Sequence, residues 1–449
     1  MAEIKTFPMG GVHPPENKLS AKSAIVYPEV QDNETYIVPV SQHIGKQAKT
    51  VVKRNDKVKV GTLIAKGDGF ISANVHASVS GTVTKVDFAM DSSGYKRLSV
   101  SIRTKDDEWE EEIDRSPELK KDFDYSPEEI IEKVKKAGIV GMGGATFPSH
   151  VKLSPPKEAK ADVLIVNGVE CEPYLTADHR LMLEKGEEIL VGTQLLMKAL
   201  GVDKALVGIE ENKKDAIDHL SKLAEDYPGI KVYGLKVKYP QGGEKQLITA
   251  LIKKEVPSGK IPVYIGAVVH NVGTIFSVYE AVQKNKPLIE RVVTITGESL
   301  QNPANYMARI GVPLNRLATL SGGIPDDTGK IISGGPMMGK ALNSVEVPIT
   351  KGTSGIMFVP DKNAHRPKGY DPCIRCIECV TVCPAGLEPY LLMALGERRL
   401  WERSEEEDAM DCIECGSCSY VCPSDRPLLD YIRLDKGNII SMKKKFIGA

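Results

Sequence analysis

The sequence predicts a multidomain protein of mixed α/β and α+β class. Three observations predict it: short valine-rich runs between glycines near the N-terminus, alternating strand-like and helix-like segments in the middle, and eight of the nine cysteines within residues 373–422. At 449 residues the chain is long enough for about three domains of ordinary size. The predicted segments, in chain order, are 1–115, 120–285, 286–350, 360–435 and a basic tail at 436–449.

The composition excludes several functional classes. Charged residues make up 27% of the chain and the formal net charge is -1, so no basic field is available to hold a nucleic-acid backbone. No apolar run is long enough to span a bilayer, so membrane association is expected to be indirect, through partners. The first ten residues, MAEIKTFPMG, show no secretion signal, and the cysteines are therefore expected to be reduced.

The first segment is predicted to be a small β module. Residues 20–104 alternate short valine-rich runs with glycine turns, and an acidic run at 107–114 predicts a solvated linker after them. The stretch GDGFISANVHASVSGTVTKV resembles the biotinyl and lipoyl carrier fold, which implies a barrel-sandwich hybrid. Phe70 stands where that fold presents a lysine for modification. We therefore expect a scaffold and not a swinging-arm carrier.

The second segment is predicted to be an α/β domain with a parallel sheet. Ser126, Pro127 and Glu129 have the types and spacing of a helix start with a capping box. The runs DVLIV (162–166) and KALVGI (204–209) predict buried strands with amphipathic helices between and after them. Such alternation predicts βαβ units with helices on both faces of the sheet. Residues 290–345 then predict a small α+β unit.

The cysteines form two groups of identical spacing. CIRCIECVTVCP and CIECGSCSYVCP both read C-x2-C-x2-C-x3-C-P, the pattern of bacterial ferredoxins with two [4Fe-4S] clusters. Zinc is the alternative, but zinc sites separate their C-x2-C pairs by a longer arm. In such ferredoxins the fourth cysteine of each group binds the other cluster. The predicted ligand sets are Cys373, Cys376 and Cys379 with Cys422, and Cys412, Cys415 and Cys418 with Cys383.

Two loops of the α/β domain have the composition of a ligand site. GMGGATFPSHVKL, from Gly141 to Leu153, has glycines that leave amides free to meet a phosphate. NGVECEP places Asn167, Glu170 and Glu172 just after a buried strand, at the sheet edge where α/β proteins bind ligands. Taken alone, each motif is also compatible with an ordinary structural turn.

Together these loops resemble the NADH- and FMN-binding subunit of respiratory Complex I, which implies a Rossmann-type flavin and NADH domain. Met142, Val169, Cys171 and Lys245 depart from that pattern, in place of an arginine, an aspartate, a serine and an acidic residue. By the resemblance, Gly141, Gly143, Gly144, Lys152, Asn167 and Glu170 would contact the flavin, Phe147 and Glu172 would serve the dinucleotide, and two further loops would bring Gly243, Glu244, Asn271 and Thr274.

The opening FPMGGVHPPENK, residues 7–18, resembles the RnfC family, the C subunits of Rnf ferredoxin:NAD+ oxidoreductases. The order of parts is also similar: carrier-like β module, flavin domain, β-grasp ligand-binding unit, and a C-terminal α-helical two-cluster ferredoxin domain. The resemblance implies a peripheral subunit on the cytoplasmic face of the cell membrane, with the other Rnf subunits, membrane-embedded and ferredoxin-like, as partners. It implies hydride exchange between NAD(H) and noncovalent FMN, single-electron transfer through two [4Fe-4S] clusters, and no catalytic side chain.

Two alternatives stay open. The chain could be a flavin-free electron-transfer docking subunit, an interpretation that the departures at Met142 and Val169 favour. It could also be a cobalamin reductase of a microcompartment, a relative that shares the flavin domain and clusters but lacks the opening segment.

Overall fold

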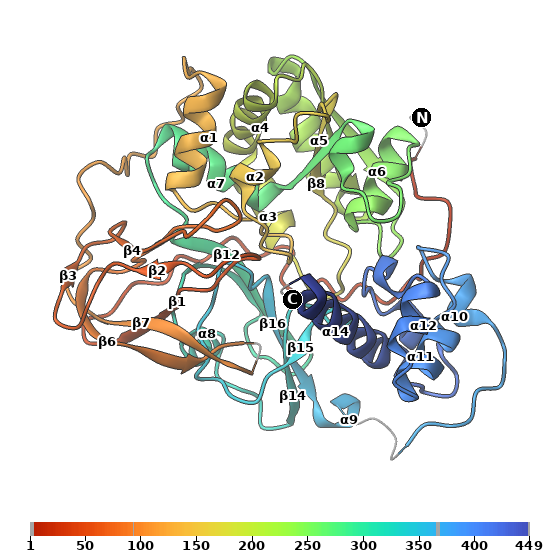
Figure 1. Ribbon diagram of the computed structural model, residues 1–449. Coiled ribbons are helices and arrows are strands. Elements are labelled where there is room, and N and C mark those ends of the chain that lie inside the picture. Colours follow the sequence, from red (N-terminus) through yellow and green to blue (C-terminus); the bar gives the residue numbers. More distant parts are fainter. Residues whose placement is uncertain (1–3, 93, 365–368, 448–449) are drawn as a thin grey trace.

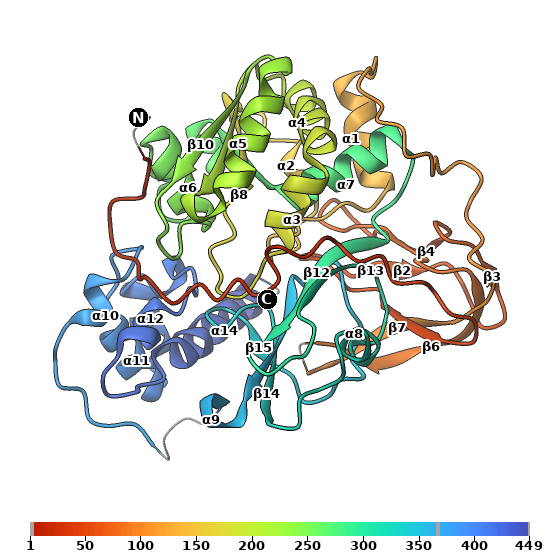
Figure 2. The same cartoon turned by 180° about the vertical axis from the view of Figure 1, so that it is seen from behind.

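The computed structural model describes residues 4–92, 94–364 and 369–447. The α/β domain, the β-rich units and the C-terminal helices form three lobes that meet at the centre of the molecule (Figure 1). The N-terminal segment runs along the α/β domain, passes the C-terminal helices and crosses the centre towards the β module (Figure 2). This segment therefore contacts parts of the chain that are far apart in sequence.

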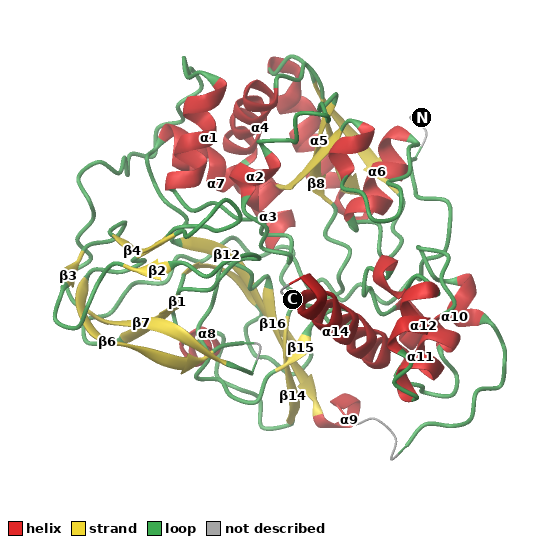
Figure 3. Ribbon diagram, viewed as in Figure 1, coloured by secondary structure: helices red, strands yellow, loops and turns green. Residues whose placement is uncertain are grey.

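The N-terminal β module contains two small antiparallel sheets (Figure 3). Phe70, 63% exposed, lies between β4 and β5, and its carbonyl oxygen is 3.0 Å from Nε2 of His150 in the α/β domain. The backbone at the position that a carrier would modify is therefore in contact with the neighbouring domain. One sheet contains β1 (Thr35–Pro39), β7 (Lys96–Thr104), β6 (Gly81–Met90) and β3 (Lys57–Val58), and the other contains β2 (Lys49–Thr50), β4 (Leu63–Lys66) and β5 (Val75–His76).

The α/β domain has the predicted parallel sheet, in the order β10-β9-β8-β11. Leu164 and Val166 of β8 pack on one face with helices α4 (Gly186–Leu200) and α7 (Val272–Gln283). Val163 and Ile165 pack on the other face with helix α6 (Glu244–Ile252). The strand sequence is continuously apolar because both faces are covered. The strands are β8 (Val163–Gly168), β9 (Ala205–Glu210), β10 (Ile230–Leu235) and β11 (Ala267–Asn271).

The first helix of this domain begins as the sequence predicts. The Ser126 side chain accepts a hydrogen bond from the amide of Glu129, and the Glu129 carboxylate accepts one from the amide of Ser126. This confirms the predicted capping box of α1. The helices are α1 (Pro127–Lys136), α2 (Ser149–Lys152), α3 (Ala177–Glu184), α4 (Gly186–Leu200), α5 (Lys214–Leu223), α6 (Glu244–Ile252) and α7 (Val272–Gln283).

The third unit is a mixed five-stranded sheet with one helix, in the strand order β13-β12-β16-β14-β15. Its central strand, β16 (Gly355–Pro360), lies beyond residue 350, where sequence analysis ended the unit. The boundary was too early because β16 is fully buried and pairs with both β12 and β14. The other elements are β12 (Glu290–Gly297), β13 (Ala304–Arg309), α8 (Leu314–Leu320), β14 (Thr328–Ser333) and β15 (Lys340–Ala341).

The cysteine-rich region is helical, as predicted, and follows the short helix α9 (Asp361–Ala364). Its last helix, α14 (Leu428–Ile447), continues without a break past residue 436, where sequence analysis placed the start of a basic tail. No helix among the described residues is long and apolar enough to cross a membrane. The remaining helices are α10 (Glu378–Thr381), α11 (Pro389–Glu397), α12 (Trp401–Glu406) and α13 (Ser417–Val421).

Candidate functional site

The loops that sequence analysis assigned to a ligand site meet at the carboxyl edge of the parallel sheet. Asn167, near the end of β8, donates from Nδ2 to the carbonyl of Gly242 at 2.9 Å. Lys152 donates to the Glu244 carboxylate at 2.6 Å and to the carbonyl of Val269 at 3.1 Å. Segments that are distant in sequence are thus joined at one edge, where ligands bind in open α/β sheets.

The glycine-rich loop presents free backbone at this edge. Gly143 and Gly144 are exposed, and within the described residues their amides have no hydrogen-bond acceptor. Gly144 has a φ of +112°, and a Cβ added there would meet nothing within 4 Å. Only glycine adopts this conformation readily, and the backbone faces open space. Such amides fit the phosphate or ring oxygens of a nucleotide.

The start of α7 closes the other side of the loop. Thr274 is fully buried, and its hydroxyl oxygen accepts a 2.9 Å hydrogen bond from the amide of Met142. Asn271 caps α7 and donates to the Asp178 carboxylate at 2.7 Å. Burial and the nearby charge of Glu170 raise the pKa of Asp178 above its usual range. Asn271 is therefore held by two elements, and its side chain lies 3.5 Å from the Cβ position of Gly143.

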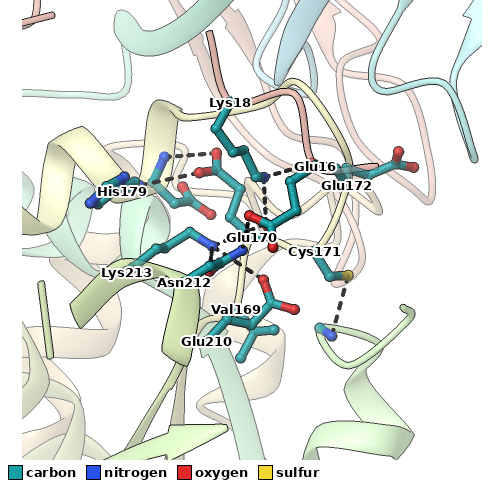
Figure 4. A network of polar contacts seen from close by, with 12 residues as sticks. Glu16, Lys18, Val169, Glu170, Cys171, Glu172, His179, Glu210, Asn212 and Lys213 are labelled. Carbon is teal, nitrogen blue, oxygen red and sulfur yellow. Dashed lines mark hydrogen bonds and ion pairs between the residues drawn. The ribbon is translucent and has the colours of Figure 1, made fainter. Parts of the chain in front are cut away.

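Glu170 and Glu172 have different partners, although they are two residues apart. Glu170 caps α3, since its carboxylate accepts hydrogen bonds from the amides of Asp178 at 3.0 Å and His179 at 3.3 Å. Glu172 points to the third unit (Figure 4). There it accepts hydrogen bonds from the amides of two methionines in the turn between β14 and β15. Burial raises the pKa of Glu172 to about 7.

Two buried lysines support the turn that carries Glu170 and Glu172. Lys18, from the N-terminal segment, donates to the carbonyls of Glu170 and Glu172 at 2.8 Å and of Leu175 at 2.7 Å (Figure 4). Burial lowers the pKa of Lys18. Lys213 lies beside it and pairs with the Glu210 carboxylate at 3.1 Å. Lys18 was not predicted as a site residue, because one lysine in a proline-rich segment carries no pattern that reveals its partners.

Each departure from the Complex I pattern has a structural explanation. Val169 is 6% exposed and packs in the apolar core on the α6 side of the sheet. Cys171 is also packed, and burial raises the pKa of its thiol. Lys245 pairs at 3.5 Å with Asp411, the neighbour of Cys412.

Met142 is buried where the pattern has an arginine. A guanidinium nevertheless reaches this position, since Arg291 of β12 donates to the Met142 carbonyl at 3.3 Å. The third unit thus contributes a positive charge beneath the glycine-rich loop.

The second predicted ligand set, which is called the second cysteine group from here on, is brought together in the interior. Cys383, Cys412, Cys415 and Cys418, the predicted ligand set, line one cavity. Burial, together with Cys415 and Cys383, raises the pKa of Cys412 to about 11. No three metal-binding side chains among the described residues are placed to hold a single ion. The spacing of two, two and three residues between these cysteines and their neighbours fits a four-iron cluster, whereas zinc sites separate their C-x2-C pairs by a longer arm.

The first cysteine group lies at the surface. Cys373 and Cys376 are exposed, whereas Cys379 is buried. Burial raises the pKa of the Cys379 thiol, and the nearby sulfurs of Cys422 and Cys373 raise it further. Cys422 packs against an apolar cluster that contains both Cys379 and Cys418, and its assignment to the first cluster stays a prediction.

The second cysteine group adjoins the α/β domain directly. Tyr239, at the start of the loop that carries Gly243, donates its hydroxyl hydrogen to the carbonyl of Cys415 at 2.7 Å. Gln246 of α6 donates to the carbonyl of Pro384 at 3.3 Å. A Cβ at Gly10 of the N-terminal segment would lie 2.6 Å from the carbonyl of Cys383. Tyr239 opens the further loop predicted for the site, residues 239–246, but nothing in that motif marks a contact with the cysteines.

Four family models match the chain in the predicted order. They describe an RnfC barrel sandwich hybrid domain at 5–108, a Nuo51 FMN-binding domain at 134–280, an SLBB domain at 292–341 and a 4Fe-4S dicluster domain at 365–423. The predicted fold class is confirmed. The predicted cofactors, FMN and two [4Fe-4S] clusters, are those that these domains carry.

Curated relatives cover nearly the whole chain. The C subunit of the proton-translocating ferredoxin:NAD(+) oxidoreductase complex of Clostridium ljungdahlii is 45% identical over 96% of this chain and 93% of its own length. The C subunit of the Na(+)-translocating complex of Acetobacterium woodii is 43% identical over 97% and 98%. This chain belongs to the RnfC family. The C subunit of the ion-translocating oxidoreductase complex of Rhodobacter capsulatus is 40% identical over 96% of this chain and 82% of its own length.

A solved structure shares the fold of this RnfC family member. The match is a chain of NAD+-reducing [NiFe]-hydrogenase in the air-oxidized state, with a TM-score of 0.50 and 19% identity. It covers 70% of this chain and 66% of that chain. At this identity the similarity extends to the fold alone.

Proposed function

We propose that this RnfC family member is the NAD(H)-reactive subunit of a membrane-bound, ion-translocating ferredoxin:NAD+ oxidoreductase. It exchanges hydride between NAD(H) and noncovalent FMN in the α/β domain and passes single electrons through two [4Fe-4S] clusters. The observation that carries the proposal is the hydrogen bond from the Tyr239 hydroxyl to the backbone carbonyl of Cys415. It joins the loop of the candidate flavin site to the cavity lined by the second cysteine group, so both kinds of redox centre have adjoining sites.

The residues at the sheet edge have roles in binding and orientation. The free amides of Gly143 and Gly144 suit the oxygens of the nucleotide, and Lys152 supplies a positive charge. The Asn167 side chain, which is fixed by hydrogen bonds to Gly242 and Val169, retains a second amide hydrogen that could be donated to a flavin ring. Bound FMN supplies hydride chemistry that no side chain provides. The further residues proposed for this pocket are Gly141, Phe147, Glu170, Gly243, Glu244, Asn271 and Thr274.

We assign the two cysteine groups to different ends of the electron path. The second group, with Cys415, adjoins the α/β domain and would exchange electrons with it. The first group, with exposed Cys373 and Cys376, would exchange electrons with another subunit of the complex. As a subunit of such a complex, the chain would lie peripherally on the cytoplasmic face of the membrane, held there by its partners.

Cofactor analysis of the anaerobically purified chain tests the proposal. We expect about eight irons per chain, as two four-iron clusters require, together with about one FMN released by denaturation. Added NADH should bleach the flavin absorbance band. A chain that holds its iron but neither carries nor takes up FMN would support the flavin-free docking subunit instead. Rapid NADH-dependent reduction of cobalamin would support the cobalamin reductase.

A further inference from the structure

We propose that Glu172 is a positioning residue that holds the third unit against the flavin domain and so fixes the second cysteine group beside it. Its partner is the turn between β14 and β15, residues 334–339, here called the methionine turn. The consequence for electron transfer rests on the proposed function, whereas the contact itself does not. This role differs from the contact with the dinucleotide that the Complex I resemblance implies.

Both oxygens of Glu172 are engaged by the methionine turn. Oε1 accepts a hydrogen bond from the amide of Met338 at 2.8 Å, and Oε2 accepts one from the amide of Met337 at 3.2 Å. Hydrogen bonds to a carboxylate are stronger than those between neutral groups. Gly335 allows this approach, because a Cβ there would lie 2.2 Å from Oε2.

The opposite side of the methionine turn contacts the cysteine-rich region. Met337 packs in an apolar cluster that includes Tyr239 and Cys415. The carbonyl oxygen of Met337 lies 2.7 Å from the Cβ position of Gly416, so this glycine also permits a close approach. Arg433 of α14 donates to the carbonyl of Met338 at 3.1 Å. The turn is therefore wedged between Glu172 of the flavin domain and the chain that flanks Cys415.

This wedge links two regions that are far apart in sequence. The Glu172 carboxylate accepts hydrogen bonds from one side of the methionine turn, and Gly416, next to Cys415, contacts the other side. Release of Glu172 would free the turn on its flavin-domain side and would leave the chain around Cys415 held by the Tyr239 hydrogen bond with less support, so that the second cysteine group could shift. Electron transfer slows steeply with separation, so such a release would slow transfer while the binding of NADH is maintained by other residues.

Amide hydrogen exchange of the full chain tests the contact directly. In Glu172→Ala and in Gly335→Ala we expect exchange at Met337 and Met338 at least about tenfold faster than in the wild type, because an amide that loses its acceptor opens more readily. Glu346→Ala is the matched control, since Glu346 is an exposed carboxylate of the same unit. Unchanged protection in either test variant would overturn the proposal.

Stopped-flow mixing with NADH then tests the consequence. In Gly335→Ala we expect flavin bleaching with the wild-type dependence on NADH concentration, followed by reduction of the clusters at least about tenfold more slowly than in the wild type. Cluster reduction at the wild-type rate in both test variants would overturn the positioning role. A wild-type chain that NADH does not bleach would instead contradict the proposed function, and the exchange result would still stand.

Discussion

The two cysteine groups have the same spacing but opposite surroundings. Cys373 and Cys376 of the first group are exposed, and so are their neighbours Ile374 at 68% and Ile377 at 64%. The second group lines an interior cavity and is bonded to the α/β domain through Tyr239. The spacing thus predicts the same ligand chemistry for both groups, while packing gives the two groups different neighbours.

The largest effects should come from removal of one ligand in each group. We expect Cys415→Ser and Cys376→Ser each to lose about half of about eight irons, because each disrupts one four-iron cluster. Cys415→Ser should also prevent NADH from reducing the remaining cluster, whereas Cys376→Ser should not. Iron analysis and electron paramagnetic resonance after NADH addition measure both effects. Equal reduction of the remaining cluster in the two variants would contradict the different roles of the groups.

Chelation of iron should also distinguish the groups. With an iron chelator and a mild oxidant, we expect about four irons to leave in a fast phase, at least about tenfold ahead of the rest, because solvent reaches Cys373 and Cys376 directly. The fast phase should be absent from Cys376→Ser, which provides the control. Loss of all the iron in one phase would show that exposure does not govern cluster lability.

Removal of one hydroxyl should have a smaller effect. Tyr239→Phe leaves the carbonyl of Cys415 without its buried donor, which should lower the free energy of unfolding by about 1–3 kcal/mol. Tyr370→Phe is the matched control near the first group, where Tyr370 is 39% exposed and its hydroxyl bonds Glu397. We expect less than about 1 kcal/mol from the control, because water replaces the lost partner. Denaturant titration measures both, and equal losses would argue against a buried contact at Cys415.

The smallest effect should come from the ion pair beside the second group. Lys245 and Asp411 are partly exposed and 3.5 Å apart, so Lys245→Ala should cost no more than about 1 kcal/mol of unfolding free energy. The difference from the wild type should fall as salt rises from about 0.05 to about 0.5 M, since ions screen exposed charges. A loss that is independent of salt would show that Lys245 acts through packing.

The fold was predictable where the pattern is local. The capping box around Ser126 and the buried runs at 162–166 and 204–209 lie within single elements, and the structure confirms them. The strand β16 was missed because Gly355 pairs with Thr294, which lies far earlier in the chain, and no local signal reports such pairing.

The candidate site was predictable from its motifs, but its supporting residues were not. The glycine-rich loop, Asn167 and the cysteine groups can be identified by composition and spacing. Lys18 donates to backbone carbonyls, and the methionine turn donates its backbone amides to Glu172. Every residue type has such backbone groups, so the sequence does not indicate these contacts. Only the placement of the N-terminal segment and the third unit against the turn at Glu172 reveals them.

The order in which NADH reduces the two clusters tests the central claim most directly. The wild-type chain, with its full iron and FMN, would be mixed with NADH and frozen at successive times, and each cluster would be identified from the spectra of Cys415→Ser and Cys376→Ser. The account predicts bleaching of the flavin, then reduction of the cluster at Cys415, then reduction of the cluster at Cys376. Reduction of the exposed cluster first, or of either cluster before the flavin, would contradict it.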